Sequence, residues 1–147
     1  MAQKSTVNSL TVSLEKVYEK LPPLPVGVKD FLVVIAPWFA LVFGIIGILG
    51  SLSAFGLSTV LSPFVALGGG VGVATSLIVV SLIGLVESVM MLVAFPSLMK
   101  RKIFGWSMLF WSEVLAVIAS VVSLSVVGVV LSLVWFYFIF QVKSYYK

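Results

Sequence analysis

The most constraining feature of the sequence is an apolar stretch that carries no charge from Phe31 to Thr59. Runs of more than about 20 apolar residues are typical of helices that cross a lipid bilayer. The rest of the chain follows the same pattern, since 61% of its 147 residues are hydrophobic and only 10% are charged. A soluble domain needs about 25% charged residues to cover its surface. The sequence therefore predicts an integral membrane protein, with the lipid bilayer as its first partner.

The residue types that are missing limit the chemistry. The chain has no cysteine, so it offers no disulfide, thiol nucleophile or thiolate metal ligand. It also has no histidine, the commonest metal ligand and the usual general base near neutral pH. We therefore expect no enzymatic activity, no metal and no cofactor. The net charge of +4 is small and gives no reason to expect a nucleic-acid partner.

Residues 1–25 form a segment of mixed composition ahead of the apolar region. Its apolar side chains recur at steps of three and four, which places on one helical face Val7, Leu10, Leu14, Val17, Tyr18 and Leu21. This pattern predicts an amphipathic helix on the cytoplasmic membrane surface. The alternative is a tail that docks on the rest of the protein or on a partner. Pro22 and Pro23 end the helix and begin a stiff, extended linker.

Residues 26–147 are expected to form an all-α domain, an antiparallel bundle of four transmembrane helices. The spans are placed at about residues 31–55, 73–95, 105–123 and 126–142. Pro63 and the run Gly68-Gly69-Gly70 interrupt residues 58–72, which favours an outside loop there over a shallow re-entrant turn. Ser123-Leu124-Ser125 is the best candidate for the turn between the last two spans.

The basic residues predict the orientation of the four spans. In this topology all of them fall on one side of the membrane: Lys4, Lys16, Lys20, Lys29, Lys100, Arg101, Lys102, Lys143 and Lys147. Loops rich in Lys and Arg stay in the cytoplasm. Both termini are therefore expected to be cytoplasmic.

Small residues and aromatic residues predict how the spans pack and where they end. Small side chains at helical spacing allow close approach of helices in lipid, and the candidates are Gly44, Gly47, Ser51, Gly84, Ala116, Ser120 and Gly128. Aromatic side chains are enriched at both membrane–water interfaces, and the candidate anchors are Trp38, Trp106, Trp135, Tyr145 and Tyr146.

Glu87 and Glu113 are the two carboxylates well inside predicted spans. From the cytoplasmic ends of their helices they lie roughly 18 Å and 12 Å deep, so an antiparallel hairpin brings them to similar depths. A charge there costs at least about 2.5–3.5 kcal/mol, and we expect one or both carboxyls to be protonated near neutral pH. A hydroxyl neighbours each along the chain, Ser88 beside Glu87 and Ser112 beside Glu113.

Three interpretations of this pair remain open. The carboxyls could be neutral groups that lock the second span against the third, a proton or cation site in an oligomeric transporter or channel, or a contact for a polar residue of another membrane protein. We expect a structural or accessory membrane protein that packs with itself or with a larger complex. The alternative is a small oligomeric proton- or cation-coupled transporter or channel that uses Glu87 and Glu113.

Several segments together resemble a known group of proteins: Leu21-Pro22-Pro23-Leu24-Pro25, Ala36-Pro37-Trp38, Ala94-Phe95-Pro96-Ser97-Leu98, Gly105-Trp106 and the ending Phe140-Gln141-Val142-Lys143-Ser144-Tyr145-Tyr146-Lys147. In these the chain is similar to small four-span bacterial membrane proteins to which no activity is assigned. The resemblance implies the four-helix organisation only, and it implies no activity. Separately, we expect the chain to lie in the bacterial cytoplasmic membrane.

Overall fold

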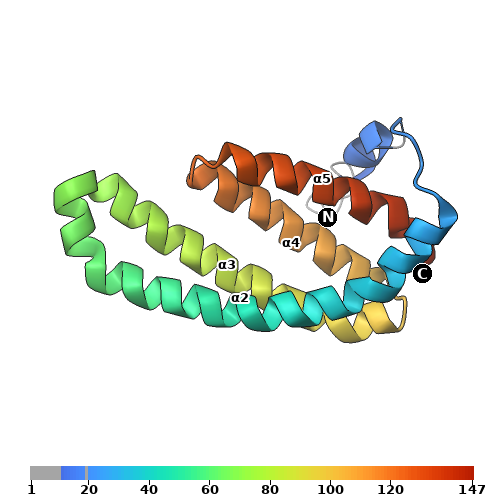
Figure 1. The fold of residues 1–147 in the computed structure, drawn as a ribbon, viewed down its shortest axis with the longest axis horizontal. Coiled ribbons are helices and arrows are strands. Elements are labelled where there is room, and N and C mark those ends of the chain that lie inside the picture. The colour runs from blue at the N-terminus through green and yellow to red at the C-terminus, as the bar shows by residue number, and fades with distance from the viewer. Residues whose placement is uncertain (1–10, 19) are drawn as a thin grey trace, which may run out of the picture.

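The computed structural model describes residues 11–18 and 20–147, and their regular structure is all helical (Figure 1). After a short helix over residues 11–18 come four long helices, α2 (Val26–Gly69), α3 (Val71–Met99), α4 (Ile103–Val122) and α5 (Val126–Val142). A 3-10 turn, η1 (Lys143–Tyr145), follows α5. The described ranges contain no strand. The predicted all-α fold is confirmed.

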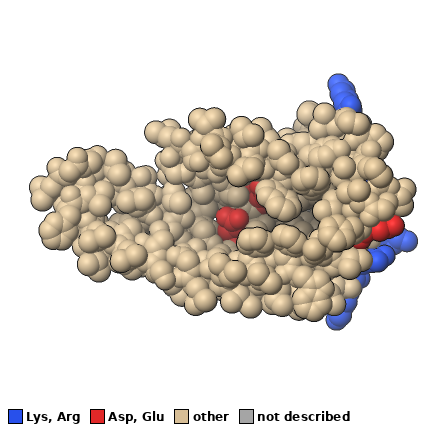
Figure 2. Space-filling view, in the orientation of Figure 1, with Lys and Arg blue, Asp and Glu red and all other residues tan. Residues whose placement is uncertain are grey.

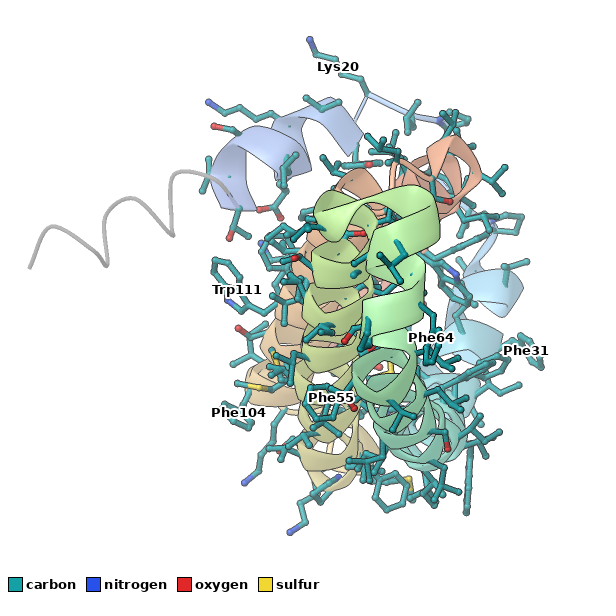
Figure 3. All side chains as sticks on the ribbon, turned by 90° about the vertical axis from the view of Figure 1, so that its left-hand side faces the viewer. Lys20, Phe31, Phe55, Phe64, Phe104 and Trp111 are labelled. Carbon is teal, nitrogen blue, oxygen red and sulfur yellow. The ribbon has the colours of Figure 1, made fainter. Side chains whose placement is uncertain are left out.

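The four long helices are each long and apolar enough to cross a membrane. α4 and α5, with 20 and 17 residues, are about 30 Å and 26 Å long, which suits a hydrocarbon core of about 30 Å. Large apolar side chains cover the outside, and Figure 3 shows Phe31 and Phe104 pointing away from the bundle on opposite sides. Apolar surface this extensive needs lipid or protein around it. The chain is therefore a multi-pass membrane protein.

The expected loop over residues 58–72 is wrong. α2 continues through Pro63 to Gly69, and only Gly70, with φ of 85°, separates it from α3. Pro63 cannot donate to the carbonyl of Thr59, but the hydroxyl of Ser62 does so at 2.9 Å. Hydroxyls can satisfy the carbonyls that a proline frees, so a helix in lipid tolerates the interruption. Figure 1 shows that α2 instead bends strongly near its green end, before Gly70.

The second hairpin follows the sequence pattern closely. α4 begins two residues before the expected 105, and α5 covers the expected 126–142. The turn falls at Ser123-Leu124-Ser125 as predicted, with Leu124 at a φ of 52°. The hydroxyl of Ser125 accepts from the N–H of Gly128 at 3.1 Å, an N-cap that satisfies one of the free amides at the start of α5.

The N-terminal helix is confirmed over residues 11–18, while Val7 and Leu10 lie outside the described residues. Its Leu14 and Tyr18 pack against the buried core of the bundle. The hydroxyl of Tyr18 donates to the carbonyl of Leu133 in α5 at 3.2 Å. This helix therefore docks on the bundle, and its position relative to a membrane surface stays a prediction.

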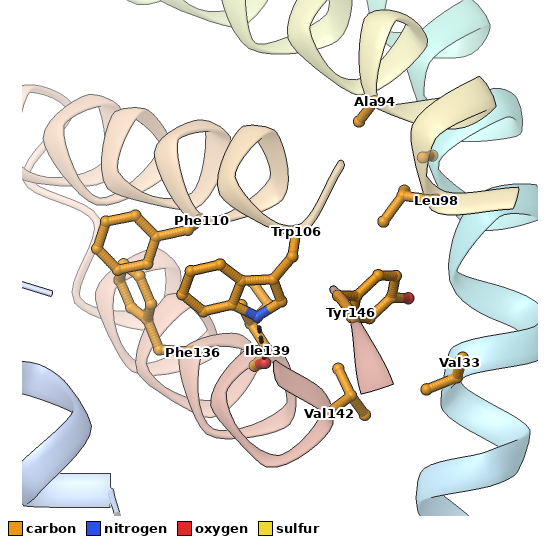
Figure 4. Close-up of a cluster of buried hydrophobic side chains, with 10 residues drawn as sticks. Val33, Ala94, Leu98, Trp106, Phe110, Phe136, Ile139, Val142 and Tyr146 are labelled. Carbon is orange, nitrogen blue, oxygen red and sulfur yellow. Dashed lines mark hydrogen bonds between the residues drawn. The ribbon is translucent and has the colours of Figure 1, made fainter. Parts of the chain in front are cut away.

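The long helices pair into two hairpins, α2–α3 and α4–α5, that converge at the end where the C-terminus lies and diverge towards the other end (Figure 1). The buried core gathers at the converging end, around Trp106, Phe110, Phe136, Ile139 and Tyr146 (Figure 4). α3 packs on α4, whereas α2 makes few contacts with α5. The bundle is thus closed at one end and splayed at the other.

Candidate functional site

The closed end is held by backbone contacts between the two hairpins. A Cβ placed on Gly105 in α4 would lie 2.7 Å from the backbone N of Leu98 in α3, so only glycine allows this approach. The last residue, Lys147, accepts from the N–H of Ile103 at 2.8 Å and donates to the carbonyl of Arg101 at 2.9 Å. These bonds fix the C-terminus to the turn between α3 and α4.

The splayed part leaves a hollow between the hairpins. Figure 2 shows acidic side chains at the floor of this hollow, whereas the basic side chains lie at the converging end of the molecule. Glu87 in α3 and Glu113 in α4 are the acidic residues within the long helices away from that end. They lie near enough to interact electrostatically, which agrees with the similar depths expected from the sequence.

The two carboxyls have different surroundings. Glu113 is buried, with 8% of its surface exposed, and the Ser132 side chain of α5 lies near its carboxyl group. Glu87 is half-buried, and no described residue donates a hydrogen bond to its carboxylate. Glu87 is therefore the member of the pair that is open to a further partner.

The serines next to the glutamates in sequence do not bind them. The Ser88 hydroxyl donates to the carbonyl of Gly84 at 2.6 Å, and the Ser112 hydroxyl donates to the carbonyl of Leu109 at 2.8 Å. Neighbouring residues on a helix point about 100° apart, which turns both hydroxyls away from the adjacent carboxyl. Ser132 is the hydroxyl nearest to Glu113 that the sequence did not single out, and its one signal was a small side chain on the last span.

The small residues lie where helices approach closely. Gly44 and Gly47 of α2 face the α3 residues Leu92 and Ser88, and a Cβ on either glycine would meet those side chains. Ser51 packs against Gly84 in the same way, with its Oγ 2.9 Å from a Cβ placed there. These contacts join the two helices of the first hairpin.

A second close contact joins α4 and α5. A Cβ on Gly128 would lie 2.6 Å from the Oγ of Ser120. Ala116, one turn earlier, is half-buried and its carbonyl accepts from the Ser120 hydroxyl at 2.8 Å.

Two of the expected interface anchors are core residues instead. Trp106 and Tyr146 are each only 4% exposed, and both lie in the buried cluster of Figure 4. Trp38 and Trp135 are 53% and 46% exposed and remain available to an interface, and Tyr145 is half-buried. The sequence identifies aromatic residues near helix ends, but it does not show which of them are buried by the neighbouring helices.

The helices and the hollow define the class of the protein, an all-helical multi-pass membrane protein with a pair of carboxyls between two hairpins. Comparison of the chain with models of protein families, with curated proteins and with solved structures finds no match. The resemblance to four-span bacterial proteins therefore stays a prediction, and function must be argued from the site itself.

Proposed function

We propose that the chain is an accessory subunit of a membrane complex, and that the groove between its two hairpins receives a transmembrane helix of another protein. The observation that supports this is the pair of interacting carboxyls, Glu87 and Glu113, of which Glu87 has no hydrogen-bond donor among the described residues. An ionisable group among apolar helices is costly unless another group pairs with it. The occupant of the groove is the natural source of that group.

The partner helix carries a basic side chain near its middle. Two neighbouring carboxyls attract a cation more strongly than one does, and Lys or Arg in a membrane helix has the complementary need for an anion. A second copy of the chain cannot supply this cation, since it has no Lys or Arg from residue 31 to 99 or from 103 to 142. The partner is therefore a different protein.

We place the complex in the bacterial cytoplasmic membrane with both termini in the cytoplasm. The described basic residues lie at the converging end of the bundle, where Figure 2 shows them on the visible face. The positive-inside rule assigns that end to the cytoplasm.

The test uses a designed partner of known sequence. A leucine–alanine helix of about 23 residues with one central Lys, and a dansyl label, is mixed with the protein in vesicles of phosphatidylethanolamine and phosphatidylglycerol. Energy transfer from the protein's tryptophans to the label reports association. Matched helices with a central Leu or a central Glu are the controls.

The proposal expects transfer to the Lys helix well above the transfer to the Leu and Glu helices. The double variant Glu87→Gln, Glu113→Gln should reduce it to the Leu level, while Asp30→Asn, which changes a carboxylate outside the groove, should not. Equal transfer to the Lys and Leu helices, or an unaffected double variant, would refute the proposal. Thermal unfolding in detergent confirms that each variant is folded.

A second candidate function is a proton or cation site in an oligomeric transporter or channel. The interaction between Glu87 and Glu113 favours it, because two coupled carboxyls can share a proton or hold a cation. One protomer leaves the groove open on one side, so such a path needs a second protomer. Proton and ion flux in liposomes between pH 5 and 8, abolished by Glu87→Gln and by Glu113→Gln, would support this function over the first.

A further inference from the structure

A second site lies at the converging end of the bundle, away from the two glutamates. An open pocket of about 560 Å³ lies between the N-terminal segment, the start of α2, the start of α4 and the end of α5. Its volume is within the range of small-molecule sites, about 300–1,000 Å³. The docking of residues 11–18 and 20–25 on α5 forms one wall of this pocket, through Tyr18 and through the bond of 2.6 Å from the Tyr137 hydroxyl to the carbonyl of Pro22.

Several polar side chains of the lining have hydrogen-bond donors that are not used within the described residues. The N–H of Leu24 donates to Oε1 of Gln141 at 3.3 Å, which leaves the Gln141 amide NH₂ free to donate. Lys29 is half-buried and Ser144 is exposed, and the side chain of neither has a hydrogen-bond or ionic partner among the described residues. A pocket lined by an ammonium, an amide NH₂ and a hydroxyl, all unpaired, fits a ligand rich in acceptor oxygens.

The charges of the lining favour an anion. Glu15 is the one acidic residue of the pocket wall, and it is already paired with Lys143 at 2.6 Å. Lys29 then leaves the pocket with one uncompensated positive charge. An ammonium and several neutral donors around one space are the usual recognition set for a phosphate group.

Another part of the lining is apolar and belongs partly to the candidate membrane spans α4 and α5. Leu21, Ile103 and Phe140 contribute to the wall beside the polar groups. This combination suits an amphiphile with its phosphate among the donors and its glycerol and first methylenes against the apolar wall.

We propose that this pocket binds the headgroup of an anionic phospholipid such as phosphatidylglycerol. Its phosphodiester lies within reach of Lys29, Gln141 and Ser144, and the site forms only while the N-terminal segment is docked. Bound lipid therefore holds the N-terminal helix over residues 11–18 on α5. This proposal depends on the membrane setting and is independent of the partner helix proposed for the groove.

The test measures thermal unfolding of the purified full chain in maltoside detergent against increasing dioctanoyl phosphatidylglycerol. A ligand that binds the folded state raises Tm in proportion to the logarithm of its concentration over Kd, so the titration gives an apparent Kd. Dioctanoyl phosphatidylcholine and inorganic phosphate are titrated in parallel. The variants are Lys29→Gln and Ser144→Ala, with Lys100→Gln as a matched loss of charge at the same end but outside the pocket.

We expect phosphatidylglycerol to stabilise the wild type more than phosphatidylcholine does, and Lys29→Gln to weaken the apparent Kd about fivefold. Ser144→Ala should weaken it less, and Lys100→Gln should leave it within about twofold. Three results would each overturn the proposal. They are equal effects of the two lipids, a loss in Lys100→Gln as large as in Lys29→Gln, and stabilisation by inorganic phosphate equal to that by lipid.

Discussion

The indole N–H of Trp106 in α4 donates a buried hydrogen bond of 2.8 Å to the backbone carbonyl of Ile139 in α5 (Figure 4). The same indole stacks on Phe110 with ring centroids 5.7 Å apart and meets Phe140 edge-on at 5.9 Å. Hydrogen bonds between membrane helices and close packing are the main forces that hold such helices together. Trp106 therefore joins the two helices of the second hairpin at the closed end of the bundle.

Replacing this indole should destabilise the protein. Trp106→Phe loses the hydrogen bond and leaves part of the indole volume empty, which together should lower the free energy of unfolding by about 1–3 kcal/mol. Denaturation in mixed detergent micelles measures this loss of unfolding free energy. Trp111→Phe is the control, because Trp111 is half-buried and its indole N–H has no hydrogen bond to a described residue. Equal losses in both variants would contradict a specific role for the bond to Ile139.

Gly47 should not accept a side chain. A Cβ there would overlap the side chain of Ser88 in α3, and such overpacking costs about 1–3 kcal/mol. Gly50→Ala is the control on the same helix, since nothing lies within 4 Å of a Cβ at Gly50. We expect Gly47→Ala to lower Tm in detergent and Gly50→Ala to leave it unchanged or higher. Adding Ser88→Gly to Gly47→Ala should restore much of the loss, and a failure of this rescue would argue against the contact.

The hydroxyl of Tyr146 should be a source of instability at high pH. It is buried without a hydrogen-bond partner in the described part of the chain, and burial raises the pKa of Tyr146 from 10.0 to about 12, although Arg101 opposes the shift. Between pH 10 and 12 the unfolded chain releases a proton that the folded chain keeps, so stability falls as pH rises through this window. Below pH 10 the effect is absent.

Tyr146→Phe isolates that effect from other groups that titrate at high pH. At pH 7 it should leave Tm unchanged or raise it, because it removes an unpaired buried hydroxyl. The fall in Tm from pH 10 to 12 should be smaller in Tyr146→Phe than in the wild type. A clear loss of stability in Tyr146→Phe at pH 7 would show instead that the hydroxyl has a partner.

The ion pair between Glu15 and Lys143 should hold the N-terminal helix locally. The Lys143 Nζ and Glu15 Oε2 atoms are 2.6 Å apart, and both side chains are 29% exposed. We therefore expect the pair to contribute less than about 1 kcal/mol to the free energy of unfolding. Glu15→Gln should speed hydrogen exchange of residues 11–18 by up to about fivefold with little change in Tm. The exchanged pair Glu15→Lys, Lys143→Glu should return the rate towards that of the wild type, and Lys16→Gln, at an exposed position, should not change it.

High salt provides an independent check on the same pair. Salt screens exposed charges, so it should speed exchange in the wild type more than in Glu15→Gln. An equal response of both proteins would indicate that the hydrogen bonds of Tyr18 and Tyr137, rather than the ion pair, hold the segment.

The sequence by itself determined the membrane class, the all-helical fold and the second hairpin. A continuous uncharged stretch as long as Phe31–Thr59 satisfies its backbone in lipid as a helix, because every hydrogen bond then lies within the segment. The turn at Ser123-Leu124-Ser125 is likewise local, because the Ser125 hydroxyl caps the helix that begins beside it. The similar depth of Glu87 and Glu113 followed from helix length alone.

Only the tertiary structure decided which side chains meet. Pro63 predicts an interruption of the helix, yet the Ser62 hydroxyl donates to the carbonyl of Thr59 and α2 continues to Gly69. Ser132, rather than the adjacent Ser112, reaches Glu113, and Trp106 and Tyr146 are buried rather than exposed to an interface. Each outcome depends on which faces of two helices turn towards each other, and that is set by the packing of residues far apart in the chain rather than by the periodicity of one segment.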